Sequence, residues 1–447
     1  MDCWRGDHLG IADNSKARTP NIDAIAQQSH YFSNAYTCGG WTKIAMTSLF
    51  SSTHSSMYGF TQGKMCSERP NLAEELQANG YYTAGFTTNL VCGQSGGFER
   101  GFDSFHEPRP SAPKGRQLNR NRKFNKLASH SMTGPILSKL TPSVLPFYPT
   151  TDADDLVTMA IDWLQEERDQ PYFLWLHFMD LHWPYRSSSR KIDGQEYTQM
   201  WQDRESWQKV KESRGQFYPG DKRAERWRQL YSEETQALDK TLGRLFTSLK
   251  QHKDWQDTAL CITSDHGEEL YENGSWAHSW NQLRREGTHV PLILKLPRQS
   301  KGSNDFNAVS QLDIAPTLLT LAGIDCPIKM LGKNLLSPAQ EPLIISEMLG
   351  HLNSYKYRLS IRQNGYHYIY DGDKNKCHLY AGSAKNDIYA VDCQISKKFD
   401  ILRLQHISMG ALDMLKGKLI IGEDEISYDL DDDPAVIERL RALGYIN

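Results

Sequence analysis

An apolar run of four residues leads directly into two side chains that could bind a metal ion. Residues 260–263 (LCIT) have the composition of a buried strand, and Asp265, His266 and Gly267 follow almost at once. Open α/β sheets carry their binding groups at the carboxyl ends of strands. A carboxylate beside an imidazole suits Zn²⁺, Mn²⁺ or Ca²⁺, and Gly267 would allow a tight turn. The alternative is an Asx-type turn with an incidental histidine.

Five further motifs occur along the chain, and their order is stronger evidence of a family relationship than any one of them. They are residues 2–10 (DCWRGDHLG), 19–23 (TPNID), 40–50 (GWTKIAMTSLF), 177–185 (HFMDLHWPY) and the run 290–293 (VPLI) after the Asp265 turn. Together they resemble the signatures of the sulfatases of the alkaline-phosphatase superfamily, from residue 1 to about residue 325. The resemblance implies an α/β fold with a mostly parallel central sheet between helices, and a small C-terminal antiparallel sheet subdomain.

The resemblance also implies a role for individual residues. Displacement at a sulfate or phosphate ester needs a nucleophile, a cation and an acid for the leaving alcohol. The expected set is Asp2, Asp265, His266 and Thr42 as ligands of one divalent ion (Ca, Zn or Mn), Thr42 as nucleophile, His182 as general acid, and His278 and Lys43 as substrate-binding groups. His177 lies inside an apolar run, so we expect it to be a core or supporting histidine.

The nucleophile position departs from the sulfatase pattern. Sulfatases carry Cys or Ser in a C/S-x-P-x-R frame and convert it to formylglycine, whereas this chain has Thr42, with Met46 at the arginine position. Threonine cannot give the aldehyde, so no formylglycine is expected. Threonine here resembles the phosphoethanolamine and lipoteichoic-acid transferases of the superfamily, in which a metal-bound alkoxide attacks phosphorus. The alternative for Thr42 is an ordinary helix N-cap. Cys3 stands where many sulfatases have a second Asp ligand.

The sequence therefore predicts a metal-dependent hydrolase of sulfate or phosphate esters, with Thr42 as metal-bound nucleophile and His182 as general acid. One alternative is a transferase that moves a phosphoethanolamine or phosphoglycerol-type headgroup. Another is a non-catalytic, anion-binding sulfatase homologue, which Met46 and Cys3 would suit. The expected partner is an anionic ester, such as a sulfated or phosphorylated glycan or lipid headgroup.

Composition excludes some classes of partner. The 447 residues carry a formal net charge of −3, which argues against a general nucleic-acid binder. No run of apolar residues approaches the length of about 18 that a membrane span needs.

The start of the chain is unusual for this fold. A buried strand is expected before Asp2, but only Met1 precedes it, so we expect a reading frame that begins further upstream. The localisation of the protein therefore stays open. The eight cysteines form no CxxC pair, which favours reduced thiols over bridges such as Cys66–Cys92 or Cys377–Cys393.

Apolar periodicity gives the elements that must position these side chains. It predicts strands at 31–36, 81–86 and 172–177 and helices starting near 71, 152 and 224, an alternation typical of a parallel sheet. We assign residues 1–330 to a catalytic domain and 331–447 to a smaller α+β subdomain. Residues 108–151 form a basic, proline-rich excursion, which is either a solvated segment or a positively charged rim over an anionic substrate. Residues 186–222 form a second insertion.

Overall fold

The computed structural model describes residues 1–58, 64–107, 152–183, 185, 222–272, 276–278, 283–337, 343–349, 357–363, 365–371, 376–383 and 386–389. The predicted excursion at 108–151 lies outside these residues, as does nearly all of the predicted insertion at 186–222. The predicted domain division at residue 330 stays a prediction.

One part of the central α/β unit is a purely parallel sheet. Its strands are β2 (Tyr82–Thr87), β3 (Ser104–His106) and β4 (Tyr172–His177), in the order β3-β2-β4. Helix α7 (Ala153–Leu164) precedes β4, and the Asp152 side chain caps it by accepting from the N–H groups of residues 154 and 155. The βα alternation predicted from the sequence is confirmed in this part of the chain.

A second sheet contains the strand that leads to Asp265. Its strands are β1 (His30–Tyr36), β5 (Leu260–Thr263), β8 (His289–Val290), β9 (Leu292–Lys295) and β10 (Ser303–Ser310), with the path β10-β1-β9-β5 and β8 paired to β1. β1 and β10 are parallel, but β9 runs antiparallel to both β1 and β5. Between β5 and β9 the described residues form only short elements, at 269–270, 276–277 and 285–290, and no long crossover helix of the kind that joins parallel strands.

The first two residues join the carboxyl ends of β4 and β5. The amino group of Met1 donates to the carbonyl of Thr263 at 2.9 Å, and the N–H of Asp265 donates to the carbonyl of Met1 at 3.0 Å. On the other side, the N–H of Asp2 donates to the carbonyl of Phe178 at 2.8 Å. These bonds fix Asp2 at the edge of the sheets where Asp265 also lies.

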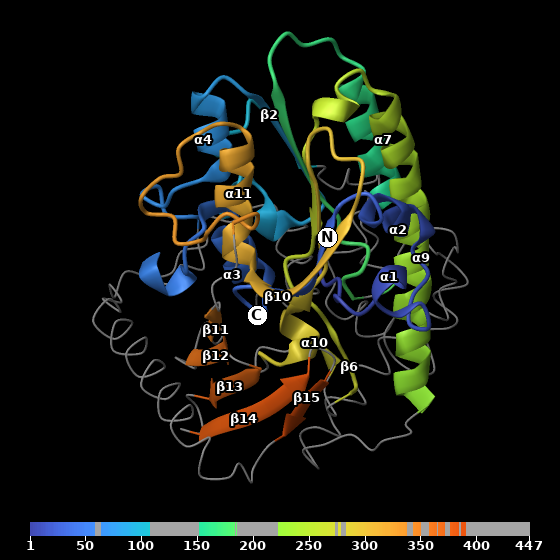
Figure 1. Cartoon of the computed structure of the whole chain (residues 1–447), viewed down its shortest axis with the longest axis vertical. Helices are drawn as coiled ribbons and strands as arrows, with labels where there is room; N and C mark the ends of the chain where they lie inside the picture. Colours follow the sequence, from blue (N-terminus) through green and yellow to red (C-terminus); the bar gives the residue numbers. More distant parts are fainter. Residues whose placement is uncertain are drawn as a thin grey trace, which may run out of the picture.

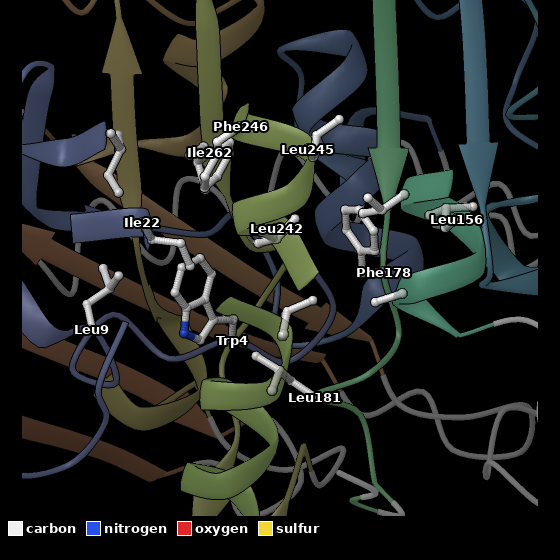
Figure 2. Close-up of a cluster of buried hydrophobic side chains, with 14 of the residues drawn as sticks. Trp4, Leu9, Ile22, Leu156, Phe178, Leu181, Leu242, Leu245, Phe246 and Ile262 are labelled. Carbon is white, nitrogen blue, oxygen red and sulfur yellow. The ribbon is translucent and has the colours of Figure 1, made fainter. Parts of the chain in front are cut away.

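Two layers of helices flank the strands (Figure 1). One layer holds α1 (Gly10–Asp13), α2 (Pro20–Ala26), α7 and α9 (Lys222–Gln251), and the other holds α3 (Thr42–Ser51), α4 (Leu72–Ala78) and α11 (Ile314–Leu321). The apolar face of α9 contributes Leu242, Leu245 and Phe246 to a buried cluster with Trp4 and Ile262 (Figure 2). Within the described ranges no helix combines the length and apolar character needed to cross a membrane.

A small antiparallel sheet follows the catalytic unit, as predicted. Its strands are β11 (Ile344–Leu349), β12 (Tyr357–Gln363), β13 (Tyr366–Asp371), β14 (Lys376–Ser383) and β15 (Asn386–Tyr389), paired in chain order. The N–H of Glu347 donates to the carbonyl of Cys38, and its carboxylate accepts from the N–H of Ser56 at 2.9 Å. The predicted fold class is therefore confirmed. The remaining short elements are α10 (Arg285–Thr288), β6 (Glu269–Leu270) and β7 (Trp276–Ala277).

The start of α2 is capped from a distant helix. The Asp239 carboxylate, buried on α9, accepts from the N–H groups of Asn21 and Ile22 at 3.2 and 2.9 Å and from the Asn21 side chain at 2.8 Å. Asp239→Ala should lower the free energy of unfolding by about 2–3 kcal/mol, because it leaves buried donors without an acceptor. Urea unfolding measures this loss. The exposed acid Glu225 on the same helix is the control, and an equal, small effect of Glu225→Ala and Asp239→Ala would contradict the capping role.

Candidate active site

The turn after β5 holds Asp265 in one orientation. Its Oδ1 accepts from the N–H of His266 at 2.7 Å and from the N–H of Cys3 at 3.1 Å. Its Oδ2 has no hydrogen-bond partner among the described residues, although the side chain is buried. One carboxylate oxygen is thus used by the fold, and the other is left for a ligand.

His266 presents its Nε2 to the same point. Its Nδ1 lies 2.9 Å from the carbonyl of Gly267, which assigns the proton to Nδ1 and the lone pair to Nε2. This Nε2 is 3.6 Å from Asp265 Oδ2 and 3.8 Å from Asp2 Oδ1. Burial opposes the charged form of His266, but the Asp265 and Asp2 carboxylates outweigh it and raise its pKa.

Gly267 is required by a close approach of two backbone segments. A Cβ at this position would lie 2.0 Å from the carbonyl oxygen of Glu286. The N–H of Gly267 also donates to the carbonyl of Gly287 at 2.9 Å. The glycine predicted to permit a tight turn therefore lets the segment before β8 pass directly beside the Asp265 turn.

Asn89, which the sequence analysis did not single out, orients Asp2. It follows the carboxyl end of β2, and its side-chain Nδ2 donates to Asp2 Oδ2 at 2.7 Å. His177 Nε2 is 3.8 Å from the same oxygen, so this predicted supporting histidine is buried beside the cluster. The only available signal for Asn89 was a polar residue just beyond an apolar strand.

Thr42 is the first residue of α3 and lies beside His266. The N-cap position belongs to Trp41, so Thr42 is not the capping residue of this helix. Its Oγ1 is 3.2 Å from His266 Nε2, and the side chain is fully buried. The structure therefore brings together the predicted ligands from three parts of the chain.

These four side chains fit a single divalent ion. Four ligands about 2.1 Å from a tetrahedral ion lie about 3.4 Å apart, and the distances from His266 Nε2 to the other three donors are 3.2 to 3.8 Å. Burial raises the pKa of Asp2, and the nearby Asp265 carboxylate raises it further. Two buried carboxylates of this kind require a positive charge to stay ionised together.

His182 lies next to the predicted ligands. Its Nδ1 is 2.6 Å from the carbonyl of Trp183, which directs the proton to Nδ1 and makes Nε2 the nitrogen that exchanges protons. Burial lowers the pKa of His182, although the Asp2 carboxylate opposes this. The imidazole rings of His182 and His278 are 4.7 Å apart between centroids.

His278 contacts two further buried groups, Cys3 and Glu268. Its Nδ1 is 3.5 Å from Cys3 Sγ and 3.5 Å from Glu268 Oε1. Burial raises the pKa of Glu268 to about 7. The sequence analysis noted Cys3 only as a departure from the family pattern. It did not single out Glu268, because in the sequence Glu268 is one of two adjacent glutamates after Gly267.

Lys43 makes contacts of another kind. Its Nζ donates to the carbonyl of Gly96 at 2.8 Å and lies 5.4 Å from the centre of the Phe98 ring. Burial lowers the pKa of Lys43 to about 8. The ammonium group is close in sequence to Thr42, but the contacts that define its position are structural, so its role in substrate binding stays a prediction.

All six cysteines with described side chains are free thiols, namely Cys3, Cys38, Cys66, Cys92, Cys261 and Cys326. The possible Cys66–Cys92 bridge is therefore wrong, and reduced thiols agree with the preferred expectation. The side chains of the other proposed pair, Cys377 and Cys393, lie outside the described part of the chain.

Comparison with known proteins identifies the family. The sulfatase family model matches residues 1–324. The chain belongs to the sulfatase family. This family member is 25% identical over 406 residues to a sulfatase of Formosa agariphila, covering 80% of this chain and 75% of the relative. It is 24% identical over 401 residues to PehA of Trinickia caryophylli, a multifunctional alkaline phosphatase superfamily protein, covering 75% of each.

Solved structures share the fold over nearly the whole chain. The phosphonate monoester hydrolase of Agrobacterium radiobacter gives a TM-score of 0.64 at 19% identity and covers 94% of this chain and 95% of that one. A protein solved with its substrate D-glucosamine-2-N,6-O-disulfate gives a TM-score of 0.66 at 15% identity, with 93% and 97% covered. At these identities the likeness shows the fold alone.

Membership of the sulfatase family makes the protein a sulfatase-type ester hydrolase, and enzymes of this family use a divalent metal. Met46, which the sequence analysis predicts to stand at the family's arginine position, is buried in an apolar cluster with Phe50 and Phe98. This position is therefore part of the core and supplies no positive charge.

Proposed function

We propose that the protein hydrolyses sulfate or phosphate esters with Thr42 as nucleophile and His182 as general acid, around one divalent ion held by Asp2, Asp265, His266 and Thr42. The observation that carries the proposal is the position of Thr42 Oγ1, 3.2 Å from His266 Nε2. A buried hydroxyl beside His266, whose Nε2 also lies near the Asp2 and Asp265 carboxylates, is an arrangement that suits an activated alcohol nucleophile.

In the proposed reaction Thr42 supplies the nucleophile, His182 transfers the protons, and water completes the hydrolysis. Thr42, having lost its hydroxyl proton to solvent, forms a bond from Oγ1 to sulfur or phosphorus as the bond to the leaving alcohol breaks. Protonated His182 gives its proton to the leaving oxygen. Neutral His182 then takes a proton from the water that cleaves the Thr42 ester, and the cycle closes. The ion, when bound, lowers the pKa of the Thr42 hydroxyl and offsets the charge on the ester oxygens.

The substrate class follows from charge and from the relatives. Lys43 and His278 are candidate partners for anionic oxygens, and we propose an anionic ester on a glycan or lipid headgroup. Relatives include an ulvan-active sulfatase, and one protein of the same fold binds a disulfated glucosamine. An unmodified threonine resembles headgroup transferases, so an acceptor alcohol in place of water is the second candidate.

A panel of nitrophenyl esters tests the proposed function. Purified protein loaded with Zn²⁺, Mn²⁺ or Ca²⁺ should release nitrophenol from a sulfate monoester, a phosphate diester or a phosphonate monoester. Added glycerol separates the two candidates, because a transferase would form a phosphoglycerol product whereas a hydrolase would not. Failure to cleave any ester with any of the three ions would refute the hydrolase.

Asp265→Asn should abolish metal binding with little effect on the fold. The asparagine carbonyl can still accept from the N–H groups of Cys3 and His266, but it has lost the charge. Asp265→Ala should lose the ion as well and also about 1–3 kcal/mol of stability, because those donors lose their acceptor. Elemental analysis and melting in chelator measure the two effects. Asp257→Ala, an exposed acid before β5, is the control; full metal occupancy in Asp265→Asn would contradict the assignment.

A further inference from the structure

A second group of potential ligands lies beside the four residues already described. Cys3 Sγ and Glu268 Oε1 are each 3.5 Å from His278 Nδ1. Cys3 and Glu268 are fully buried, and His278 is largely buried. The three donors come from the N-terminal loop, from the turn after Asp265 and from the end of β7. A thiol and a carboxylate thus both lie beside one imidazole nitrogen.

Glu268 provides independent evidence that something binds there. Its carboxylate is fully buried and makes no well-formed hydrogen bond among the described residues; it lies within reach of the Cys3 thiol and 3.5 Å from His278 Nδ1. Buried polar atoms are nearly always hydrogen-bonded, and a buried carboxylate without a donor is costly. The Arg5 guanidinium reaches only the main-chain carbonyl of Glu268, at 3.2 Å, and pairs with the Asp7 carboxylate. The side chain of Glu268 therefore faces the Cys3–His278 pair.

We propose that Cys3, Glu268 and His278 bind a second divalent cation, with a preference for zinc. In a tetrahedral zinc site with Zn–S near 2.3 Å and Zn–N and Zn–O near 2.0 Å, neighbouring donors lie about 3.3 to 3.5 Å apart. Both measured distances from His278 Nδ1 match this spacing. A thiolate ligand selects zinc over calcium or magnesium, which prefer oxygen donors. Coordination would release the thiol proton to solvent.

The backbone around Cys3 directs its side chain into this group. Cys3 adopts the left-handed conformation, with φ of 58°. The hydroxyl of Tyr231 on α9 donates to the carbonyl of Cys3 at 2.6 Å and accepts from the N–H of Arg5 at 3.0 Å. The N–H of Cys3 donates to Asp265 Oδ1 at 3.1 Å. Hydrogen bonds therefore hold both the N–H and the carbonyl of Cys3, and they fix the position of its thiol.

Asp2 connects the second site to the first. Its Oδ1 is 3.1 Å from Cys3 Sγ and 3.8 Å from His266 Nε2, so one carboxylate borders both groups of ligands. A second ion held there would add positive charge beside the proposed nucleophile and so stabilise the charge on the ester oxygens. This inference rests on the proposed function and refines it, since positive charge near His278 would come from an ion rather than from the imidazole.

Metal counting tests the second site without using turnover. The full chain is produced with zinc, dialysed against metal-free buffer and analysed for metal per chain. We expect about two zinc ions in the wild type and about one in Cys3→Ser and in Glu268→Gln. After replacement of zinc by cobalt, the wild type should show a thiolate-to-cobalt charge-transfer absorption that Cys3→Ser lacks. Cys261→Ser, a cysteine on β5 outside the group, should keep both ions and the absorption.

One ion per chain in the wild type overturns the inference. If that ion also gave the thiolate absorption, Cys3 would belong to the first site. Glu268→Gln retains the volume of the glutamate and provides the same metal count if Cys3→Ser does not fold. Ester hydrolysis with one bound ion would leave the proposed function standing and refute only the second site. Two bound ions without hydrolysis of any ester would support the second site and refute the proposed function.

Discussion

Thr42→Ala should lower kcat/KM by about 10⁴-fold or more, to the background of the assay, whereas Thr42→Ser should retain measurable turnover. Alanine removes the oxygen that would bond to sulfur or phosphorus. Serine keeps that oxygen in the first turn of α3, beside His266 Nε2, but without the methyl group that restricts its rotation. Steady-state kinetics on the best ester of the panel measure both effects.

Thr47 provides the matched control for this experiment. It is a buried threonine on the same helix, and its Oγ1 donates to the carbonyl of Lys43 at 2.7 Å. Thr47→Ala should cost stability but keep turnover within a few-fold of the wild type. Intact mass after rapid quenching should also reveal a substrate-derived group on wild-type protein and none on Thr42→Ala. Wild-type turnover by Thr42→Ala would remove Thr42 from the chemistry.

The fold was largely predictable because its signals are local. An apolar run that ends in a polar pair, as at β5, is enough to predict a strand with binding groups at its carboxyl end. The amphipathic period of α9 predicted a helix starting near residue 224, and the structure has Lys222–Gln251. The antiparallel direction of β9 was not predictable, since the apolar run in residues 290–293 is the same in either direction.

The meeting of the site residues was predictable only through family resemblance. Asp2 and Thr42 are separated from His266 by more than two hundred residues, and no periodicity relates positions so far apart. Asn89 and Tyr231 were missed for physical reasons. Asn89 reads as a loop residue until β2 is known to end beside Asp2, and Tyr231 reads as a core aromatic on α9 because its hydroxyl partners are not visible in the sequence.

Cys3 illustrates how a departure from a family pattern gains meaning from geometry. In the sequence, a cysteine at the position of a carboxylate ligand, together with Met46, motivated the alternative of a non-catalytic homologue. In the structure its thiol lies 3.1 Å from Asp2 Oδ1 and close to Glu268 and His278, within a cluster of buried polar groups. Glu268 is fully buried beside His278 and Cys3, and a decayed site has no reason to retain a buried carboxylate, because burial of such a group destabilises the fold. The arrangement therefore favours altered metal chemistry over loss of function.

His182→Asn should slow esters of poorly acidic alcohols by about 10² to 10⁴-fold, and activated nitrophenyl esters by about tenfold or less. An alkoxide leaving group must be protonated as it departs, whereas nitrophenolate is stable as an anion. Asparagine suits the test because its amide N–H₂ can replace the donor that His182 Nδ1 offers to the carbonyl of Trp183, while no group remains to supply the proton at Nε2. The local fold is thus retained and only the acid is lost.

The decisive quantity is the dependence of rate on leaving-group pKa. A plot of log kcat/KM against the pKa of the leaving alcohol should be shallow for the wild type, because His182 offsets the charge that develops on the leaving oxygen. In His182→Asn the same plot should become steeply negative, since each more basic alcohol departs without a proton. Parallel plots, with an equal loss at every leaving group, would reassign His182 from acid catalysis to substrate binding. That outcome would also fit the position of His182, because its ring lies 4.7 Å from that of His278 and beside Asp2, so only the slope separates the two roles.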